Sequence, residues 1–123
     1  MSYYDEKAPT CTVDVLGTEY RVFLDVPESV DATLKEAAGY CDETSHMIAI
    51  CRQEPEDDID DFGAYQRRVL RHELIHAFMF ESGLGGDAVW WPVDKQKQPE
   101  QTVDWLARQF PKMLKAFQTV GAL

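Results

Sequence analysis

Hydrophobic and polar residues alternate along the first part of the chain, as they do in half-buried strands. This alternation predicts two β-hairpins, whose strands span residues 11–16 with 19–26 and residues 39–42 with 46–51. Between the hairpins, residues 28–38 place apolar side chains on one helical face, which predicts a short helix. The first half of the chain is therefore expected to form a small sheet with one helical connection.

The second part of the chain changes to a helical period. Residues 62–82 contain no proline and precede Gly83, which predicts a helix of about five turns that stops at this glycine. Residues 83–98 are rich in Gly and carry aromatic residues, and they are expected to form a long irregular loop. A final helix is predicted over residues 99–120, and Pro111 is expected to kink or divide it.

These elements predict one α+β domain in a chain of 123 residues. We expect residues 1–10 to be a flexible N-terminus, because they contain few apolar residues, and residues 11–123 to form the domain. In this fold the small N-terminal β-sheet packs on the long helix at 62–82. The final helix then backs the long helix.

Charge and composition exclude several classes of function. The chain has 12 Lys and Arg against 22 Asp and Glu, a net charge of −10, so we expect no nucleic-acid partner and no anionic membrane surface. Six of the eight residues at 54–61 are acidic, and we expect them to form a solvated loop before the long helix. Three cysteines without a CxxC spacing, and no apolar N-terminal segment of the secretory type, favour a reduced, cytoplasmic protein.

The candidate chemistry lies inside the long helix, where residues 72–76 read His-Glu-Leu-Ile-His, an HExxH motif. Four residues turn a helix by about 400°, so His72 and His76 lie on one face, about 6 Å apart along the axis. Both imidazoles can then reach one Zn²⁺ ion. Glu73 lies about 100° around the helix from His72, where it is placed to take a proton from a zinc-bound water rather than to bind the metal.

A structural alternative is that both histidines belong to the core and that Glu73 forms a salt bridge with a nearby arginine (Arg67, Arg68 or Arg71). Residues 74–80 are apolar nearly all round, so we expect this part of the helix to be buried on several sides. Two histidines and a glutamate are costly to bury without partners, and a metal would satisfy all three. The sequence therefore favours the metal site over this alternative.

A third zinc ligand must come from another element. A third His at position 82 would extend the motif, but this residue is Ser82. In the final helix, Glu100 and Asp104 lie four residues apart on one face and can supply a ligand and a partner for a ligand imidazole. Val103, Leu106, Phe110 and Leu114 are expected to dock this helix. The alternatives are a first-turn carboxylate that only complements the helix dipole and His46 as the third ligand.

Trp90 and Trp91 lie side by side in the predicted loop at 83–98. They could line a substrate groove beside the metal. Alternatively, one packs into the core and the other covers a helix end.

The HExxH helix, followed by Glu100 and Asp104 on a later helix, resembles the gluzincin metallopeptidases. More narrowly, with the preceding strands, residues 38–110 are similar to the minimal zincin-like domains of the SprT-like and ImmA/IrrE-like types and to small zincin-like proteins of bacteria and their phages. The resemblance implies a zincin-like fold, with His72, His76 and Glu100 as zinc ligands and Glu73 as general base. The acidic charge is unlike that of the DNA-associated SprT-like proteins.

Two hypotheses for function follow. The first is a zinc-dependent, metallopeptidase-like hydrolase that cleaves a peptide or protein substrate with metal-activated water. The alternative is a catalytically silent, zinc-stabilised binding or regulatory module that keeps the site without turnover.

Overall fold

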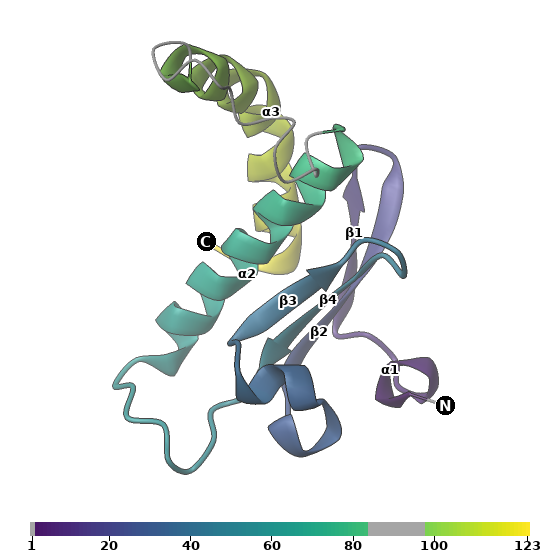
Figure 1. Ribbon diagram of the computed structural model, residues 1–123, viewed down its shortest axis with the longest axis vertical. Coiled ribbons are helices and arrows are strands. Elements are labelled where there is room, and N and C mark those ends of the chain that lie inside the picture. Colours follow the sequence, from purple (N-terminus) through teal and green to yellow (C-terminus); the bar gives the residue numbers. More distant parts are fainter. Residues whose placement is uncertain (1, 84–97) are drawn as a thin grey trace.

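The structure is a computed structural model that describes residues 2–83 and 98–123, with the backbone only for residues 98–104 and 107. Its centre is a four-stranded sheet in the order β1-β2-β4-β3 (Figure 1). The β1–β2 and β3–β4 pairs are antiparallel, and β2 and β4 are parallel. This confirms both predicted hairpins and the α+β class, and it makes β1 and β3 the edge strands. The strands are β1 Cys11–Val15, β2 Thr18–Val26, β3 Gly39–Asp42 and β4 Met47–Cys51.

The first hairpin closes through a two-residue turn at Leu16 and Gly17, whose φ angles are 52° and 96°. Positive φ at both central positions gives a turn that matches the twist of the flanking strands, and glycine adopts it without steric cost. In the second hairpin the Asp42 carboxylate accepts the backbone N–H of Thr44 at 2.9 Å, which holds the turn before β4.

The predicted helix over residues 28–38 is wrong in kind. Two short 3₁₀ helices occupy the segment, η1 Glu28–Val30 and η2 Ala32–Lys35. They are separated by Asp31, whose φ of −148° is extended and whose side chain accepts the N–H of Thr33 at 3.1 Å. The same carboxylate accepts the hydroxyl groups of two tyrosines from other elements. These polar contacts compete with a continuous helix, and the apolar periodicity could not show them.

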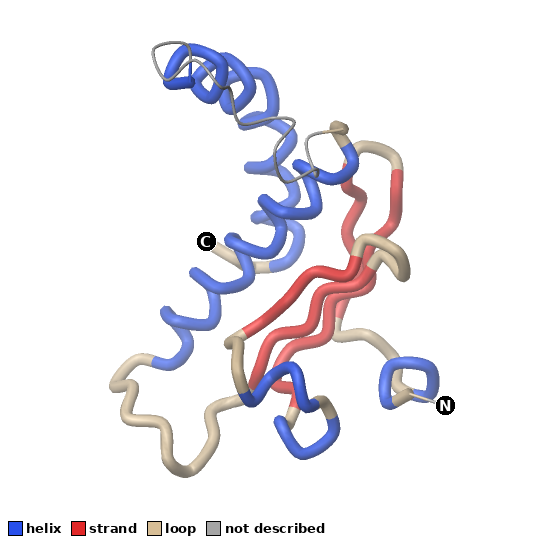
Figure 2. The backbone as a smooth tube through the Cα atoms, in the orientation of Figure 1, coloured by secondary structure: helices blue, strands red, loops and turns tan. Residues whose placement is uncertain are grey.

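The N-terminal segment predicted to be flexible contains the short helix α1 Tyr3–Glu6. Tyr4 is buried, its ring packs on Phe23 with the centroids 4.8 Å apart, and its hydroxyl donates to Asp31. The segment α1 lies on the side of the sheet opposite to α2 and α3 (Figure 2), where Tyr4, Phe23 and Leu34 belong to a second buried cluster.

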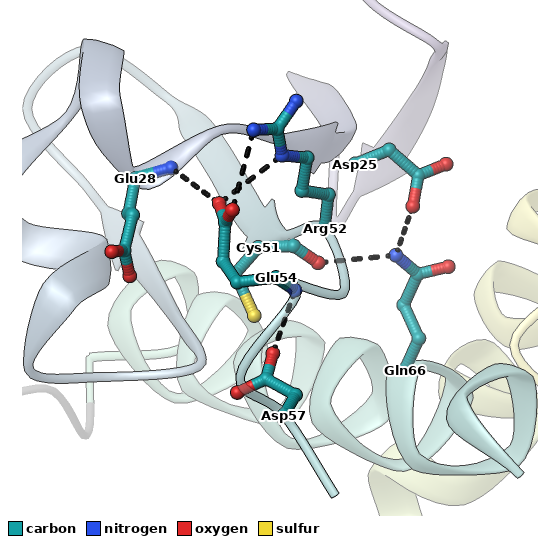
Figure 3. Close-up of polar contacts among 7 residues, drawn as sticks. All are labelled: Asp25, Glu28, Cys51, Arg52, Glu54, Asp57 and Gln66. Atoms are coloured by element: carbon teal, nitrogen blue, oxygen red, sulfur yellow. Dashed lines mark hydrogen bonds and ion pairs between the residues drawn. The ribbon is translucent and has the colours of Figure 1, made fainter. Parts of the chain in front are cut away.

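The acidic segment at 54–61 is largely exposed, as predicted, with Glu54 as the exception. Glu54 is buried and forms an ion pair with Arg52 at 3.1 Å, and its carboxylate also accepts the backbone N–H of Glu28. The Glu54 N–H in turn donates to Asp57 (Figure 3). The carboxylate is stable in this place because an arginine and a backbone N–H both satisfy it.

The long helix is α2 Phe62–Glu81, which confirms the predicted helix. Asp61 caps its start by accepting the N–H of Ala64 at 3.0 Å. Gly83 follows its end with φ of 87°, the left-handed conformation that glycine provides after a helix.

The final helix, α3 Gln98–Val120, is also confirmed. It runs antiparallel to α2, since Trp105 Nε1 donates to Ser82 Oγ at 3.3 Å while Arg71 Nη1 donates to the carbonyl of Ala122 at 2.6 Å. The helix continues through Pro111, and Figure 1 shows that its N-terminal and C-terminal parts point in different directions.

The docking face predicted for α3 is wrong at Leu106 and Phe110, whereas Leu114 is half-buried. Leu106 and Phe110 are 43% and 49% exposed, and the side chain of Val103 lies outside the described residues. The C-terminal half of α3 packs against β1 and α2 and leaves the side of Phe110 open. The residues that it buries are Met113, Ala116, Phe117 and Val120. No helix in the described part of the chain is long and apolar enough to cross a membrane.

Candidate metal centre

The two histidines of the motif lie on an exposed flank of α2, with their Nε2 atoms 3.2 Å apart. Their ring centroids are 4.9 Å apart and the ring planes meet at 70°. Two nitrogens that bind one tetrahedral zinc ion at about 2.0–2.1 Å are separated by about 3.3–3.4 Å. The spacing of His72 and His76 therefore fits a shared zinc ion. It also fits a hydrogen bond between a protonated and an unprotonated ring nitrogen.

Glu73 is the buried member of the motif, with an exposed fraction of 7%. Its carboxylate has no hydrogen bond or ion pair with any other described residue, which argues against the predicted alternative of a salt bridge to Arg67, Arg68 or Arg71. Burial raises the pKa of Glu73, and the neighbouring imidazoles of His72 and His76 act in the opposite direction. Such a carboxyl group is better matched to proton exchange near neutral pH than a solvated one.

The expectation that the helix is buried on several sides around the motif is wrong for the histidines. Both imidazoles are exposed, while Leu74 and Phe78 on the other side of α2 are buried in the core. The energetic cost of burying unpartnered polar groups therefore applies to Glu73 alone. The histidines need no metal to be stable where they are, so their mutual spacing is the stronger indication of a metal site.

Strand β3 approaches α2 on the side of Glu73. A Cβ atom at Gly39 would lie 3.0 Å from the Val69 Cγ1 atom and 2.7 Å from the Ile50 Cδ1 atom, so glycine allows this close approach. Two residues further along β3, burial raises the pKa of the Cys41 thiol to about 12, and the negative charge of Glu73 acts in the same direction. Glu73 therefore lies beside the edge strand of the sheet.

The histidines and helix α3 lie on different flanks of α2. At about 100° per residue, Arg71 and Ser82, which contact α3, lie about 80–140° around the helix from His72 and His76. The described contacts of α3 are thus made away from the histidines. The third ligand is predicted to come from the helix that packs across α2, on the premise that this helix lies near the histidines. The described contacts do not support that premise.

The remaining predicted site residues are not tested. The side chains of Glu100 and Asp104 lie outside the described residues, as do Trp90 and Trp91 and the loop predicted around them. The described residues contain no group of three His, Cys, Asp or Glu side chains that could hold a metal ion. His46 lies in the turn before β4, with its ring against Tyr20 at a centroid distance of 5.4 Å.

One contact that positions α2 has no signal in the sequence. Glu81, at the end of α2, accepts the Tyr20 hydroxyl at 2.7 Å and the Thr18 hydroxyl at 2.9 Å. This pair of bonds fixes the end of the motif-bearing helix on the first hairpin. Tyr20 and Glu81 lie far apart in the chain, and no local pattern indicates that they meet.

No protein-family model matches the chain, and no curated protein or solved structure is significantly similar to it. The functional assignment therefore depends on the residues of the site.

Proposed function

We propose that this protein is a zinc-dependent, metallopeptidase-like hydrolase of the gluzincin type, with a zincin-like arrangement of its sheet and helices. The observation that carries the proposal is the 3.2 Å separation of the His72 and His76 Nε2 atoms beside a buried, unpaired Glu73. A structural pair of histidines does not require an unpartnered carboxylate beside it. A hydrolytic metal site does.

Each residue of the proposed site has a separate chemical role. His72 and His76 hold the zinc ion through Nε2, and Glu100 is the proposed third ligand. Zinc bound there would polarise a peptide carbonyl and lower the pKa of a water molecule. Glu73 accepts the proton of the attacking water and then passes it to the leaving amine, a role that suits its raised pKa. Asp104 is proposed to accept the free ring N–H of one ligand imidazole.

The substrate is proposed to be a peptide or an extended segment of a protein. β3 is an edge strand with no neighbouring strand on one side in the described part of the chain, and it runs beside α2 (Figure 1). The charge of Glu73 acts on Cys41 of this strand, so Glu73 lies near it. An extended peptide can pair with such an edge through backbone hydrogen bonds. Trp90 and Trp91 remain candidates for the walls of the substrate site.

The cellular compartment is proposed from the cysteines. Cys11, Cys41 and Cys51 are free thiols in the structure. Free, partly buried thiols are typical of a reducing compartment, which supports a cytoplasmic protein.

Replacement of Glu73 by Gln tests the function. The variant should retain as much zinc as the wild type, while the hydrolysis of a fluorogenic peptide library should fall by about 10²–10⁴-fold. Glu6→Gln is the matched control, since Glu6 is exposed and lies on α1, across the sheet from α2 (Figure 2). If the wild type binds zinc without Glu73-dependent hydrolysis, the protein is the zinc-stabilised binding module instead. Failure of the wild type to bind zinc rejects both functions.

A further inference from the structure

Arg68 shares the flank of α2 that carries the histidines. It is exposed and lies four residues before His72, which is one turn of helix. Helical geometry places its Cα about 6 Å along the axis from that of His72, within about 40° of the same direction. Gly39, at the start of β3, lies against Val69, the next residue of α2. Arg68 is thus level with one end of the edge strand, and Glu73 is level with Cys41 further along it.

The guanidinium group of Arg68 has a defined position. It lies over the ring of Tyr65, with its central carbon 5.3 Å from the ring centroid. Tyr65 is nearly one turn towards the start of α2, so the charged group is directed away from His72. Stacking on an aromatic face limits the rotation of the side chain and leaves its N–H groups free to donate in the plane.

Arg68 has no carboxylate partner among the described residues, although acidic residues outnumber basic ones by 22 to 12. Three other arginines of the described part donate to a carboxylate or to a backbone carbonyl group. Arg52 pairs with Glu54, while Arg71 and Arg21 donate to backbone carbonyl groups. An oriented but unpaired guanidinium beside a candidate catalytic site is arranged to receive an anion from outside.

We infer that Arg68 determines specificity by binding a carboxylate of the peptide substrate, about three residues from the bond that is cleaved. The distance follows from the helix: four residues from His72 to Arg68 and three more to Tyr65 give about 10 Å. An extended peptide covers about 3.3 Å per residue, so about three residues span this distance. The inference rests on the proposed hydrolytic function and adds the substrate class to it, an extended peptide with an acidic group at one fixed position.

A series of neutral twelve-residue peptides with a single Asp moved through each position tests this inference on zinc-loaded full-length protein. Asp at one position should raise kcat/KM about fivefold over the neutral peptide, the effect of one partly exposed charge pair. This ratio should fall to about one in Arg68→Ala, and Arg68→Glu should prefer Lys at the same position. Arg67→Ala is the matched control, because Arg67 is equally exposed but points to Gly63 on another side of α2, and it should keep the ratio.

Binding separates failure of the inference from failure of the hydrolytic function. The same peptides, labelled with a fluorophore, are titrated onto zinc-loaded Glu73→Gln protein with and without Arg68→Ala, after zinc content and Tm show that the variants are folded. Tighter binding of one Asp peptide that requires Arg68, without hydrolysis by the wild type, supports Arg68 and rejects the enzyme. Hydrolysis with no preferred Asp position, or with a preference that survives Arg68→Ala, overturns the inference alone. Neither binding nor hydrolysis of any peptide overturns both.

Discussion

Replacing Glu73 with Gln in metal-free protein should raise the stability of the fold near neutral pH and leave it unchanged in acid. Glu73 is buried without a partner among the described residues, and burial raises its pKa above that in the unfolded chain. Folding therefore favours the protonated carboxyl group. Below the unfolded pKa of about 4.3 both states are protonated and nothing is lost. As the pH rises through the folded pKa, ionisation removes stability from the wild type, and Gln at this position cannot ionise.

The size of the effect follows from the exposed fraction of 7%. Burial of a polar group without a hydrogen bond costs about 1–3 kcal/mol in proteins, but the Glu73 carboxylate oxygens are not fully enclosed and the Gln amide keeps part of this cost. We therefore expect Glu73→Gln to gain about 1 kcal/mol at pH 7.5, which is about 3–5 °C in Tm for a domain of this size.

Thermal unfolding followed by circular dichroism in a chelator, across pH 4–8, measures this difference. Glu81→Gln is the control on the same helix. Its carboxylate accepts two hydroxyl groups, so its replacement should lower Tm. A Tm difference between wild type and Glu73→Gln that is independent of pH, or negative at pH 7.5, would show that the buried charge has a partner and would refute the reasoning.

Three further predictions concern zinc and the position of α2. Zinc affinity should fall as the pH drops towards about 6 because ligand histidines must be neutral, and Tm with zinc should fall more steeply than Tm without it; parallel curves contradict this. Glu100→Ala should nearly eliminate zinc retention, whereas Asp104→Ala should weaken affinity about ten- to a hundredfold and recover full occupancy at high zinc; the reverse pattern would make Asp104 the ligand. Tyr20→Phe should destabilise the fold by about 1–2 kcal/mol in urea titrations, and most of this loss should vanish in a Glu81→Gln background.

The predictions from sequence that the structure confirms are those that depend on neighbours in the chain. The length of α2 follows from the polar cap at Asp61 and from Gly83, which are adjacent to it. Both hairpins follow from alternation and short turns. The spacing of His72 and His76 follows from the helix itself, and the 3.2 Å between their nitrogens needs no tertiary contact.

The predictions that are wrong depend on contacts between distant segments. The helix expected around Asp31 is interrupted because this carboxylate accepts the hydroxyl groups of Tyr4 and Tyr40, one of them from the N-terminal segment. The docking face of α3 differs from its apolar stripe because the helix packs on β1 as well as on α2, which leaves Phe110 exposed. Periodicity identifies an apolar stripe on a helix, but it does not show which residues of the stripe pack against another element.

The two flanks of α2 separate the stability of the fold from the chemistry of the site. Leu74 and Phe78 are buried in the core, and Arg71 and Ser82 hold α3, all of them away from the exposed histidines. Of the three polar residues of the motif, Glu73 is the one that is buried, and it has no partner among the described residues. An unpaired carboxylate beside two imidazoles at this spacing is the arrangement expected if the proposed zinc ion binds after the fold has formed.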